Sequence, residues 1–503
     1  MGTPASAKLA LVSAPSAYEE LRTHLGEVAD LRRIGQILFW DQQVMMPSGG
    51  APARAEQSAT LARISHEAFI SPEIGRLLEE LTPWAEGLDP ESDEASIVRV
   101  SRRDWEKARR VPAELSAEMN RASSLALRVW AQARATSDFA SLIPSLERNF
   151  ELRRRYVECF EPAEETYDIL LDDYEPGMKT AEVRAVFDRM KPVLIEIVRN
   201  VEPAEDALAG HVLPRAAQTA FALDVLERFG YDPKSWRLDP TQHPFASSPS
   251  TNDIRLTTHY DESSLRSVFA AMHEFGHGLY EHGVDGALAR TPLGSGASMA
   301  LHESQSRMWE NLVGRSRPFW RFFYPRFRAA FTDLDLDEET LYRTVNLVTP
   351  TFIRVDADEV TYSLHVILRF ELEQELVEGR LALADLPEAW NARFKEYLGL
   401  DVPNDDVGVL QDMHWAAGHI GYFPTYALGN VASVQIWDRI VVDLPDLQAQ
   451  FEAGEFSALR DWLREHLYRL GRKFTPVETL ERVTGARLDP EPYLRYLRDK
   501  YAA

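Results

Sequence analysis

Apolar residues recur at helical spacing along almost the whole chain, and this periodicity restricts the fold more than any other feature. The first such run, from Ser16 to about Met46, ends at Pro47 and contains Leu21, Leu25, Val28, Leu31, Ile34 and Leu38. Similar patterns, separated by Pro and Gly, occupy about 53–81, 91–108, 112–136, 140–173, 179–200 and 215–229. We therefore predict a first half that is almost entirely helical.

The periodicity is interrupted between Trp236 and His259, where prolines and serines break the pattern. Polar and apolar residues alternate over 253–257, which predicts one short strand. After Gly283 the expected helices cover about 298–313, 318–330, 337–348, 357–378, 384–398, 409–417, 425–440, 445–470 and 476–500. Because no repeat or linker divides the chain, we expect a single mostly α-helical body over 1–503, with a cleft.

Composition excludes several classes of protein. The 503 residues are 45% hydrophobic, enough for a large core, and the net charge of -24 leaves no basic footprint for nucleic acid or an anionic membrane. Cys159 is the only cysteine, which excludes an internal disulfide and a cysteine-based metal site. The apolar run at 9–12 is too short for a signal peptide, and no stretch reaches membrane-spanning length, so a cytoplasmic location is the default expectation.

The stretch His273-Glu-Phe-Gly-His277 is an HExxH motif within an expected helix over 261–283. Two histidines four residues apart point from one helical face, where they can hold one ion, and Glu274 is left beside the open position to accept a proton. The alternative is a structural role for the histidines, but core histidines satisfied by hydrogen bonds would more often occur singly. We interpret the motif as the centre of a zinc hydrolase.

A catalytic zinc takes three protein ligands, so the motif needs a partner. Glu303 is the best candidate, because it lies 26 residues past His277 across a Gly-rich turn that permits an antiparallel helix, for which Ser298 is a plausible N-cap. Taken alone, Glu303 would more often be a surface carboxylate, but the upstream HExxH and the intervening loop favour a ligand. His302 is an alternative ligand, but its side chain points about 100° away from that of Glu303.

Zinc held by two histidines and one glutamate activates water for attack on a carbonyl, and peptide hydrolysis is the natural reaction. The developing oxyanion needs further hydrogen-bond donors. Tyr422 and Tyr426 could supply them, although packing of buried aromatic residues explains both equally well.

Two arginines are candidates to bind a substrate carboxylate, which selection for a free C-terminus requires. Arg255 lies in the expected strand and Arg354 follows Ile353. A planar guanidinium grips a carboxylate through two parallel hydrogen bonds, but surface ion pairing is the alternative for each. Glu281, one turn past His277, would either orient that histidine or be an ordinary exposed residue.

Taken together, these tracts resemble the carboxypeptidase Taq family of metallocarboxypeptidases. The resemblance begins near Trp40 and extends to the C-terminal helices. Its motifs occur in the family's order: His243-Pro-Phe245, Asp253-x-Arg255-x-Thr257, HEFGH at 273–277, His302-Glu-Ser-Gln305, Ile353-Arg-x-x-Ala-Asp358 and Gly408-x-x-Gln-Asp-x-His-Trp415.

The resemblance implies a helical fold similar to neurolysin and angiotensin-converting enzyme, with a groove roofed by the helices of 16–136, a small sheet beside the zinc helix and a catalytic segment over 236–430. It also implies broad-specificity release of single C-terminal residues from peptides, a zinc or cobalt ion, and a homodimer. Carried over by position, the resemblance makes His273, His277 and Glu303 the metal ligands and Glu274 the general base. It makes Arg354 the anchor for the substrate carboxylate, and it places His414 and a tyrosine of 422–426 near the oxyanion.

Two other readings remain open. An endo-acting oligopeptidase or a dipeptidyl carboxypeptidase would use the same helical groove, since HExxH and a distant glutamate are common to all. A helical binding scaffold that kept the zinc motif without catalysis is the alternative from another class.

Overall fold

A computed structural model describes residues 14–202 and 204–501, and confirms the expected mostly helical fold with one small sheet. The apolar run at 9–12 lies outside the described residues. Within the described part, no helix is long and apolar enough to cross a membrane.

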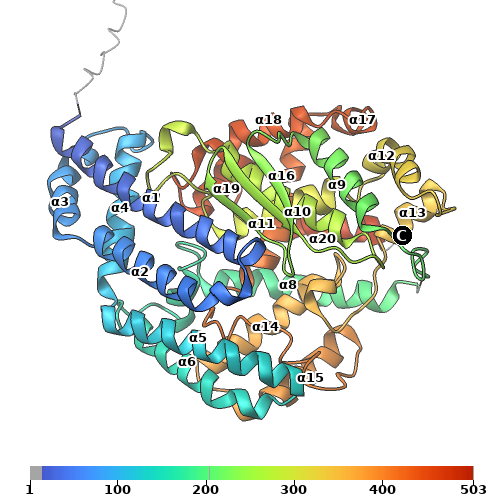
Figure 1. The fold of residues 1–503 in the computed structure, drawn as a ribbon, viewed down its shortest axis with the longest axis horizontal. Helices are drawn as coiled ribbons and strands as arrows, with labels where there is room; N and C mark the ends of the chain where they lie inside the picture. Colours follow the sequence, from blue (N-terminus) through green and yellow to red (C-terminus); the bar gives the residue numbers. More distant parts are fainter. Residues whose placement is uncertain (1–13, 203, 502–503) are drawn as a thin grey trace, which may run out of the picture.

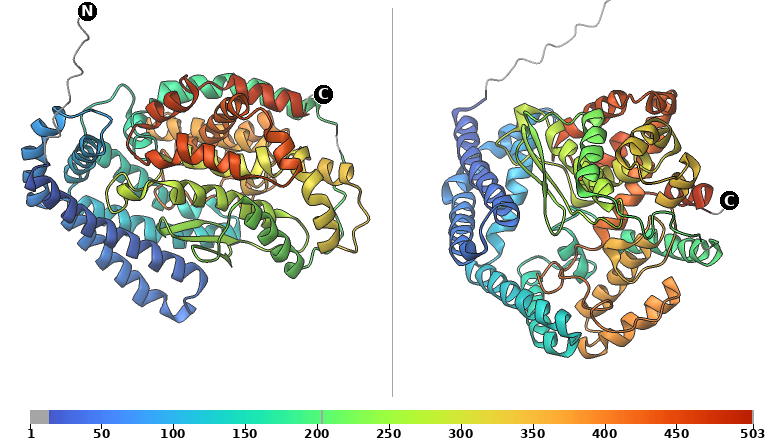
Figure 2. Two further views of the ribbon diagram at one scale, coloured as in Figure 1. Left: turned by 90° about the horizontal axis from the view of Figure 1, so that it is seen from above. Right: turned by 45° about the vertical axis from the view of Figure 1, so that its right-hand side comes forward.

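The N-terminal helices gather along one flank of the molecule (Figures 1 and 2). They are α1 (Ser16–Val44), α2 (Ala51–Phe69), α3 (Pro72–Glu86), α4 (Asp93–Arg110) and α5 (Ala113–Thr136). Leu21 and Leu25 of α1 belong to a small apolar core with Leu77 of α3, separate from the main core that α5 joins. The single helix expected over 53–81 is wrong, because the chain breaks at Ser71, whose hydroxyl caps α3 by accepting from the Ile74 amide.

The middle of the chain supplies the small sheet and the helices around it. The helices are α6 (Ile143–Val157), α7 (Thr166–Leu171), α8 (Thr180–Asn200) and α9 (Arg215–Phe229), so the continuous helix expected over 140–173 is wrong. The strands are β1 (Trp236–Pro240), β2 (Ala246–Ser250) and β3 (Asp253–Thr258). The predicted strand is confirmed as β3, the central strand, which pairs parallel with β1 and antiparallel with β2.

The helix that contains the HExxH motif packs closely against α11 (Met299–Arg307), and α11 packs closely against a third helix. In α10 (Arg266–Gly283), a Cβ on Gly276 would lie 2.4 Å from the Gln305 carbonyl oxygen of α11. In α16 (Pro424–Asp443), a Cβ on Gly429 would lie 2.5 Å from the Glu303 Cβ. Because a side chain at either position would force the helices apart, both glycines are needed for this packing.

Only some of these helices begin and end where the sequence pattern predicted. The predicted cap of α11 is confirmed, since the Ser298 hydroxyl accepts from the Leu301 amide at 3.2 Å. Helix α10 begins at Arg266 rather than 261, because Asp261 and the residues after it form a turn in which its carboxylate accepts from the Ser263 amide. A π-helical segment, η4 (Met308–Val313), continues α11.

The rest of the chain completes the main core. Its helices are α12 (Arg317–Ala330), α13 (Glu338–Val345), α14 (Thr361–Val377), α15 (Leu386–Leu398), α17 (Leu447–Glu452), α18 (Ser457–His466), α19 (Pro476–Thr484) and α20 (Glu491–Tyr501). The expected helices over 445–470 and 476–500 are each divided. The helix expected at 409–417 is wrong, because this stretch consists of turns that lead to left-handed glycines at Gly418 (φ 74°) and Gly421 (φ 96°).

Candidate metal centre

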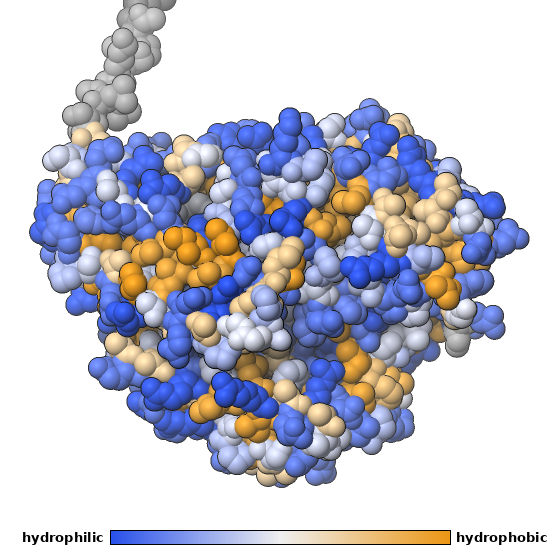
Figure 3. Space-filling view, viewed as in Figure 1, coloured by the Kyte–Doolittle hydropathy of each residue, from blue (hydrophilic) through white to orange (hydrophobic). Residues whose placement is uncertain are grey.

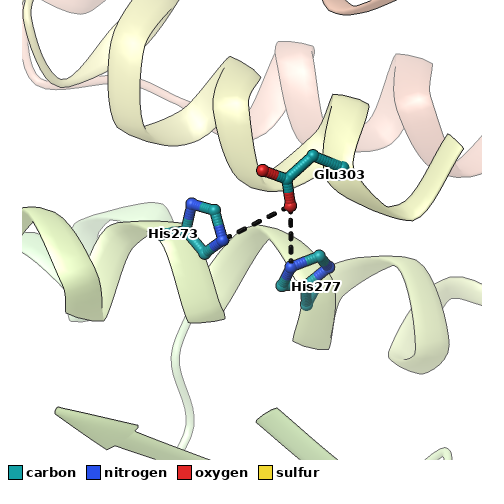
Figure 4. A group of neighbouring side chains, drawn as sticks. All are labelled: His273, His277 and Glu303. Atoms are coloured by element: carbon teal, nitrogen blue, oxygen red, sulfur yellow. Dashed lines mark ion pairs between the residues drawn. The ribbon is translucent and has the colours of Figure 1, made fainter. Parts of the chain in front are cut away.

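The structure brings together the three predicted metal ligands, two from α10 and one from α11 (Figure 4). Glu303 Oε2 lies 3.5 Å from Nε2 of His273 and 3.5 Å from Nε2 of His277. All three ligand atoms lie within 4.8 Å of one another. Two imidazole nitrogens and one carboxylate oxygen are a donor set for a divalent transition metal with an open position, so these residues fit a catalytic metal.

His273 is oriented by a carboxylate that the sequence reasoning missed. Its Nδ1 lies 2.9 Å from Glu310 Oε2, so Nδ1 carries the proton and the Nε2 lone pair faces Glu303. Burial lowers the pKa of His273, but Glu303 and Glu310 outweigh it and leave the pKa raised. Glu310 lies seven residues after Glu303, a spacing that places both on one helical face and could have revealed it.

The Arg307 guanidinium binds the carboxylates of both Glu303 and Glu310. Its Nε donates to Glu303 Oε1 at 2.7 Å and its Nη1 donates to Glu310 Oε2 at 3.2 Å. Burial raises the pKa of Glu303, yet Arg307 and the histidines outweigh this effect and hold that pKa well below its usual range. Glu303 is therefore ionised and ready to bind a cation.

His277 is oriented through a chain of three side chains. Glu281 accepts from His302 Nε2 at 3.0 Å, and His302 Nδ1 lies 3.3 Å from His277 Nδ1. With His302 donating to Glu281 from Nε2, its Nδ1 accepts from His277 Nδ1, which leaves His277 Nε2 free for a metal. Burial lowers the pKa of His277 to about 4, so the ring is neutral at neutral pH. Glu281 thus acts on His277 through His302, and Arg33 of α1 contacts Glu281 at 3.5 Å.

Glu274 faces the groove beside this centre. Its side chain is only 6% exposed, and within residues 14–202 and 204–501 it has no hydrogen bond or ion pair. Burial raises the pKa of Glu274 to about 7. A carboxyl group with that pKa can both take up and release a proton near neutral pH.

A groove of about 1320 Å³ contains these residues. Its walls come from α1, the sheet, α10, α11, the segment 344–358 and the segment 422–426. A space of this size accommodates several residues of an extended peptide.

Arg354 lines the groove but already has partners. Its Nε and Nη2 donate to Asp412 Oδ1 at 3.2 and 2.9 Å, and its Nη1 donates to the Tyr362 hydroxyl at 3.0 Å. Arg369 donates to the other oxygen of Asp412 at 2.6 Å. Among the described residues, Asp412 is the only carboxylate that either guanidinium contacts. This cluster therefore holds two positive charges against one negative charge.

The aromatic tract is divided between the groove wall and the layer behind it. Tyr422 and Tyr426 both line the groove, with ring centroids 5.1 Å apart. His414 is not on the wall, and its ring stacks against that of Tyr422 at 5.4 Å. Burial lowers the pKa of His414 to about 3, so it is neutral.

Arg255 does not join the other candidates. It is absent from the groove wall, because its guanidinium binds both oxygens of Asp253 at 2.9 and 2.8 Å and lies over the Trp40 ring at 4.5 Å. Arg237 lies 4.6 Å from the same ring. These contacts attach α1 to the sheet, a structural role for Arg255.

Comparisons with known proteins agree with this geometry. A family model described as carboxypeptidase Taq (M32) metallopeptidase matches residues 20–501. The chain is 40% identical to thermostable carboxypeptidase 1 of Thermus thermophilus, covering 97% of this chain and 99% of that protein. It is 37% identical to thermostable carboxypeptidase 1 of Pyrococcus furiosus, covering 92% and 94%. The M32 carboxypeptidase of Deinococcus radiodurans superimposes with a TM-score of 0.94 at 40% identity, covering 97% and 99%. The expected likeness to neurolysin and angiotensin-converting enzyme stays a prediction.

Proposed function

The chain belongs to the carboxypeptidase Taq (M32) family of metallopeptidases, and on this premise we propose that it releases single amino acids from the free C-terminal end of peptides. Membership makes the protein a metal-dependent peptide hydrolase. The release of one residue at a time, the identity of the metal and the roles of individual side chains are our own proposals.

The observation that carries this proposal is the unbalanced charge at Arg354. Two guanidiniums share the single carboxylate of Asp412 at the groove wall. A second carboxylate would balance the charge, and a peptide's C-terminus supplies one. The site is close to the metal centre, because Arg354 binds Tyr362, and Arg307, which binds Glu303, lies 4.1 Å from the Tyr362 ring.

The metal would be held by His273, His277 and Glu303. We propose zinc, with cobalt as an alternative, because two imidazoles and one carboxylate suit both ions. A divalent ion there supplies a Lewis acid that polarises the peptide carbonyl group.

The protein's own side chains handle the protons and the developing charge. The Glu274 carboxylate accepts a proton from the attacking water and passes it to the leaving amine. The hydroxyls of Tyr422 and Tyr426 donate hydrogen bonds to the carbonyl oxygen as negative charge develops on it. His414, stacked behind Tyr422, positions that ring.

The proposal is tested with a defined peptide and its C-terminal amide, incubated with the metal-loaded protein and followed by mass spectrometry. Stepwise loss of single residues from the acid, but not from the amide, is expected because only the acid offers a carboxylate to Arg354. A set of peptides that differ in the last residue tests breadth of specificity. Internal cuts in both the acid and the amide would instead support the endo-acting alternative, and loss of two residues at a time would support the dipeptidyl one.

We also propose a homodimer. Figure 3 shows apolar residues gathered over the α1 and α2 region, where the large exposed apolar side chains are Ile34, Ile37, Phe39, Met45 and Ile64. Such a patch favours covering by another protein surface. Light scattering during size-exclusion chromatography is expected to give twice the mass of one chain. The mass of a single chain at all concentrations would refute the dimer.

A further inference from the structure

Arg32 of α1 differs from the other arginines of the groove. Among the described residues that line the groove, the arginines with a carboxylate partner are Arg33, Arg266, Arg307, Arg315, Arg354 and Arg472. Within residues 14–202 and 204–501, Arg32 has neither an ion pair nor a hydrogen bond, and its side chain remains partly exposed on the groove wall. Its guanidinium lies 4.7 Å from the centre of the Phe69 ring, a stacking contact that leaves the N–H groups along its edge free to donate.

The surroundings of Arg32 add to this positive charge. Arg472 lines the same part of the groove and binds Asp104 with Nη1 at 2.9 Å and Nη2 at 3.3 Å. Partial burial against the groove wall lowers the pKa of Arg32, Asp104 opposes this shift and Arg472 adds to it, so the two arginines and the aspartate lie near one another. Arg472 alone binds Asp104, so the positive charge of Arg32 has no carboxylate bound to it among the described residues. The protein's net charge of -24 makes an uncompensated positive site of this kind more distinctive.

The contacts of Arg354 and of Arg33, the neighbour of Arg32, lead to opposite ends of the pair of metal-binding histidines. Arg354 is joined through Tyr362 to Arg307, and Arg307 binds Glu310, the partner of His273. Arg32 is next to Arg33, which contacts Glu281. Glu281 lies four residues past His277, about 6 Å further along α10 in the opposite direction. A peptide whose C-terminus is held at Arg354 therefore extends its upstream residues toward Arg32.

We propose that Arg32 binds an acidic side chain of the substrate, upstream of the bond that is cleaved. This inference rests on the proposed function, because the direction of the peptide follows from the anchor at Arg354. An extended peptide advances about 3.3 Å per residue, so the contacted side chain lies roughly two to five residues upstream of that bond. The site makes the enzyme prefer peptides with aspartate or glutamate there.

The test uses peptides with one C-terminal residue in common and a single glutamate moved through positions two to five upstream, with glutamine at the other three. Rates are measured for the metal-loaded wild type, for Arg32→Gln and for Arg22→Gln. Arg22 is the matched control, an arginine of α1 that has no ion pair and lies outside the groove. Because Arg32 has no ion-pair or hydrogen-bond partner within the described residues, and only its contact with Phe69 is lost, Arg32→Gln is expected to keep the fold, which a thermal melt checks.

For the wild type, glutamate at one or two neighbouring positions is expected to raise kcat/KM roughly three- to tenfold over the all-glutamine peptide. The increase is expected to come from a lower KM. Arg32→Gln is expected to lose this preference and Arg22→Gln to keep it. Raising the salt concentration to about 0.5 M should weaken it, because salt screens exposed charges. No preference at any position in the wild type, or a preference that survives in Arg32→Gln, overturns the inference.

A binding measurement separates this inference from the proposed function. The same peptides, labelled with a fluorophore, are titrated into metal-loaded Glu274→Gln protein with and without Arg32→Gln. Tighter binding of the glutamate peptides that depends on Arg32 supports the site whatever the products of turnover are. Release of C-terminal residues with equal binding of both peptide types overturns the Arg32 site alone. Internal cleavage, which mass spectrometry of the products detects, overturns the proposed function but not the Arg32 site.

Discussion

Glu310 and Glu274 both lie beside the metal-binding histidines, but their surroundings differ. Glu310 accepts from His273 Nδ1 and is itself bound by Arg307 and Arg315. Glu274 has no such partner within the described residues and faces the groove. One carboxylate is therefore held ionised to orient a ligand, whereas the other is free to exchange a proton.

Replacing Glu310 with glutamine should weaken metal binding. Loss of the charged acceptor leaves the His273 ring less firmly oriented, and substitutions of this kind typically cost about 10- to 100-fold in metal affinity. Competition with a chromogenic chelator measures the affinity. Glu339→Gln is the matched control, because Glu339 also binds two arginines, Arg317 and Arg343, but is not part of the metal centre. Equal metal affinity in Glu310→Gln and the wild type would contradict the assignment.

Replacing Glu274 with glutamine should separate metal binding from turnover. The ligands are unchanged, so metal content is expected to stay at the wild-type level, while kcat falls roughly 10²- to 10⁴-fold because the attacking water loses its base. Elemental analysis of the protein and the peptide assay give the two values. Undiminished turnover in a fully loaded variant would refute a general base at this position.

Helix α11 illustrates how a buried acid supports one element of the site. Glu175 is 1% exposed, and its Oε1 accepts from the Ala300 amide at 2.5 Å near the start of that helix. Burial raises the pKa of Glu175 to about 8, against the opposing effects of Ala300 and Ser298. The acid is therefore protonated in the folded protein at neutral pH and below.

This raised pKa makes stability depend on pH. The acid ionises near 4.5 in the unfolded chain but near 8 in the fold, so its contribution is fully present below about 4.5 and is lost as the pH rises through about 8. In Glu175→Gln, the side-chain amide oxygen can still accept from the Ala300 amide, but the side chain cannot ionise. The variant should melt close to the wild type at pH 5 and become more stable than it at pH 9, by on the order of a few kcal/mol. A difference in melting temperature that does not change with pH would contradict this.

The segment 409–417 shows why a helical pattern failed. The Gln411 side chain accepts from the Arg354 amide at 2.8 Å and donates to the Phe352 carbonyl oxygen at 2.9 Å, and Asp412 binds Arg354 and Arg369. These contacts with residues more than 40 positions away hold the chain in turns. Local periodicity contains no information about them, so it predicted a helix.

Across the whole molecule, the groove is lined by residues of both apolar cores. Helix α1 belongs to the small core yet contributes Arg32 and Arg33 to the groove, and Trp40 at its end lies against two arginines of the sheet. The metal ligands come from α10 and α11, which belong mainly to the main core. A peptide bound in the groove as proposed would therefore contact both parts, and the assignment of 16–136 as a roof stays a prediction.

Removal of the metal should affect both activity and stability. An ion that binds only the folded protein stabilises it by about 4 kcal/mol at 1,000 times its dissociation constant. After treatment with a chelator, the melting temperature is expected to fall and peptide release to stop, and zinc or cobalt should restore both. Calorimetry and the peptide assay follow the titration. Full activity in metal-free protein would contradict a metal-dependent reaction.

The sequence by itself determined the helical class of the fold, the face of α10 that carries His273 and His277, and Glu303 as their partner. These features depend on spacing along the chain, since an i, i+4 pair shares a helical face and a Gly-rich turn returns the next helix beside it. Only the tertiary structure decided that Glu310 and His302 orient the ligands, that Arg255 supports α1 and that Asp412 binds two arginines. It also decided that Arg32 has no carboxylate partner among the described residues. Each of these depends on which side chains meet across the core and the groove, and that is set by packing between elements rather than by spacing within one.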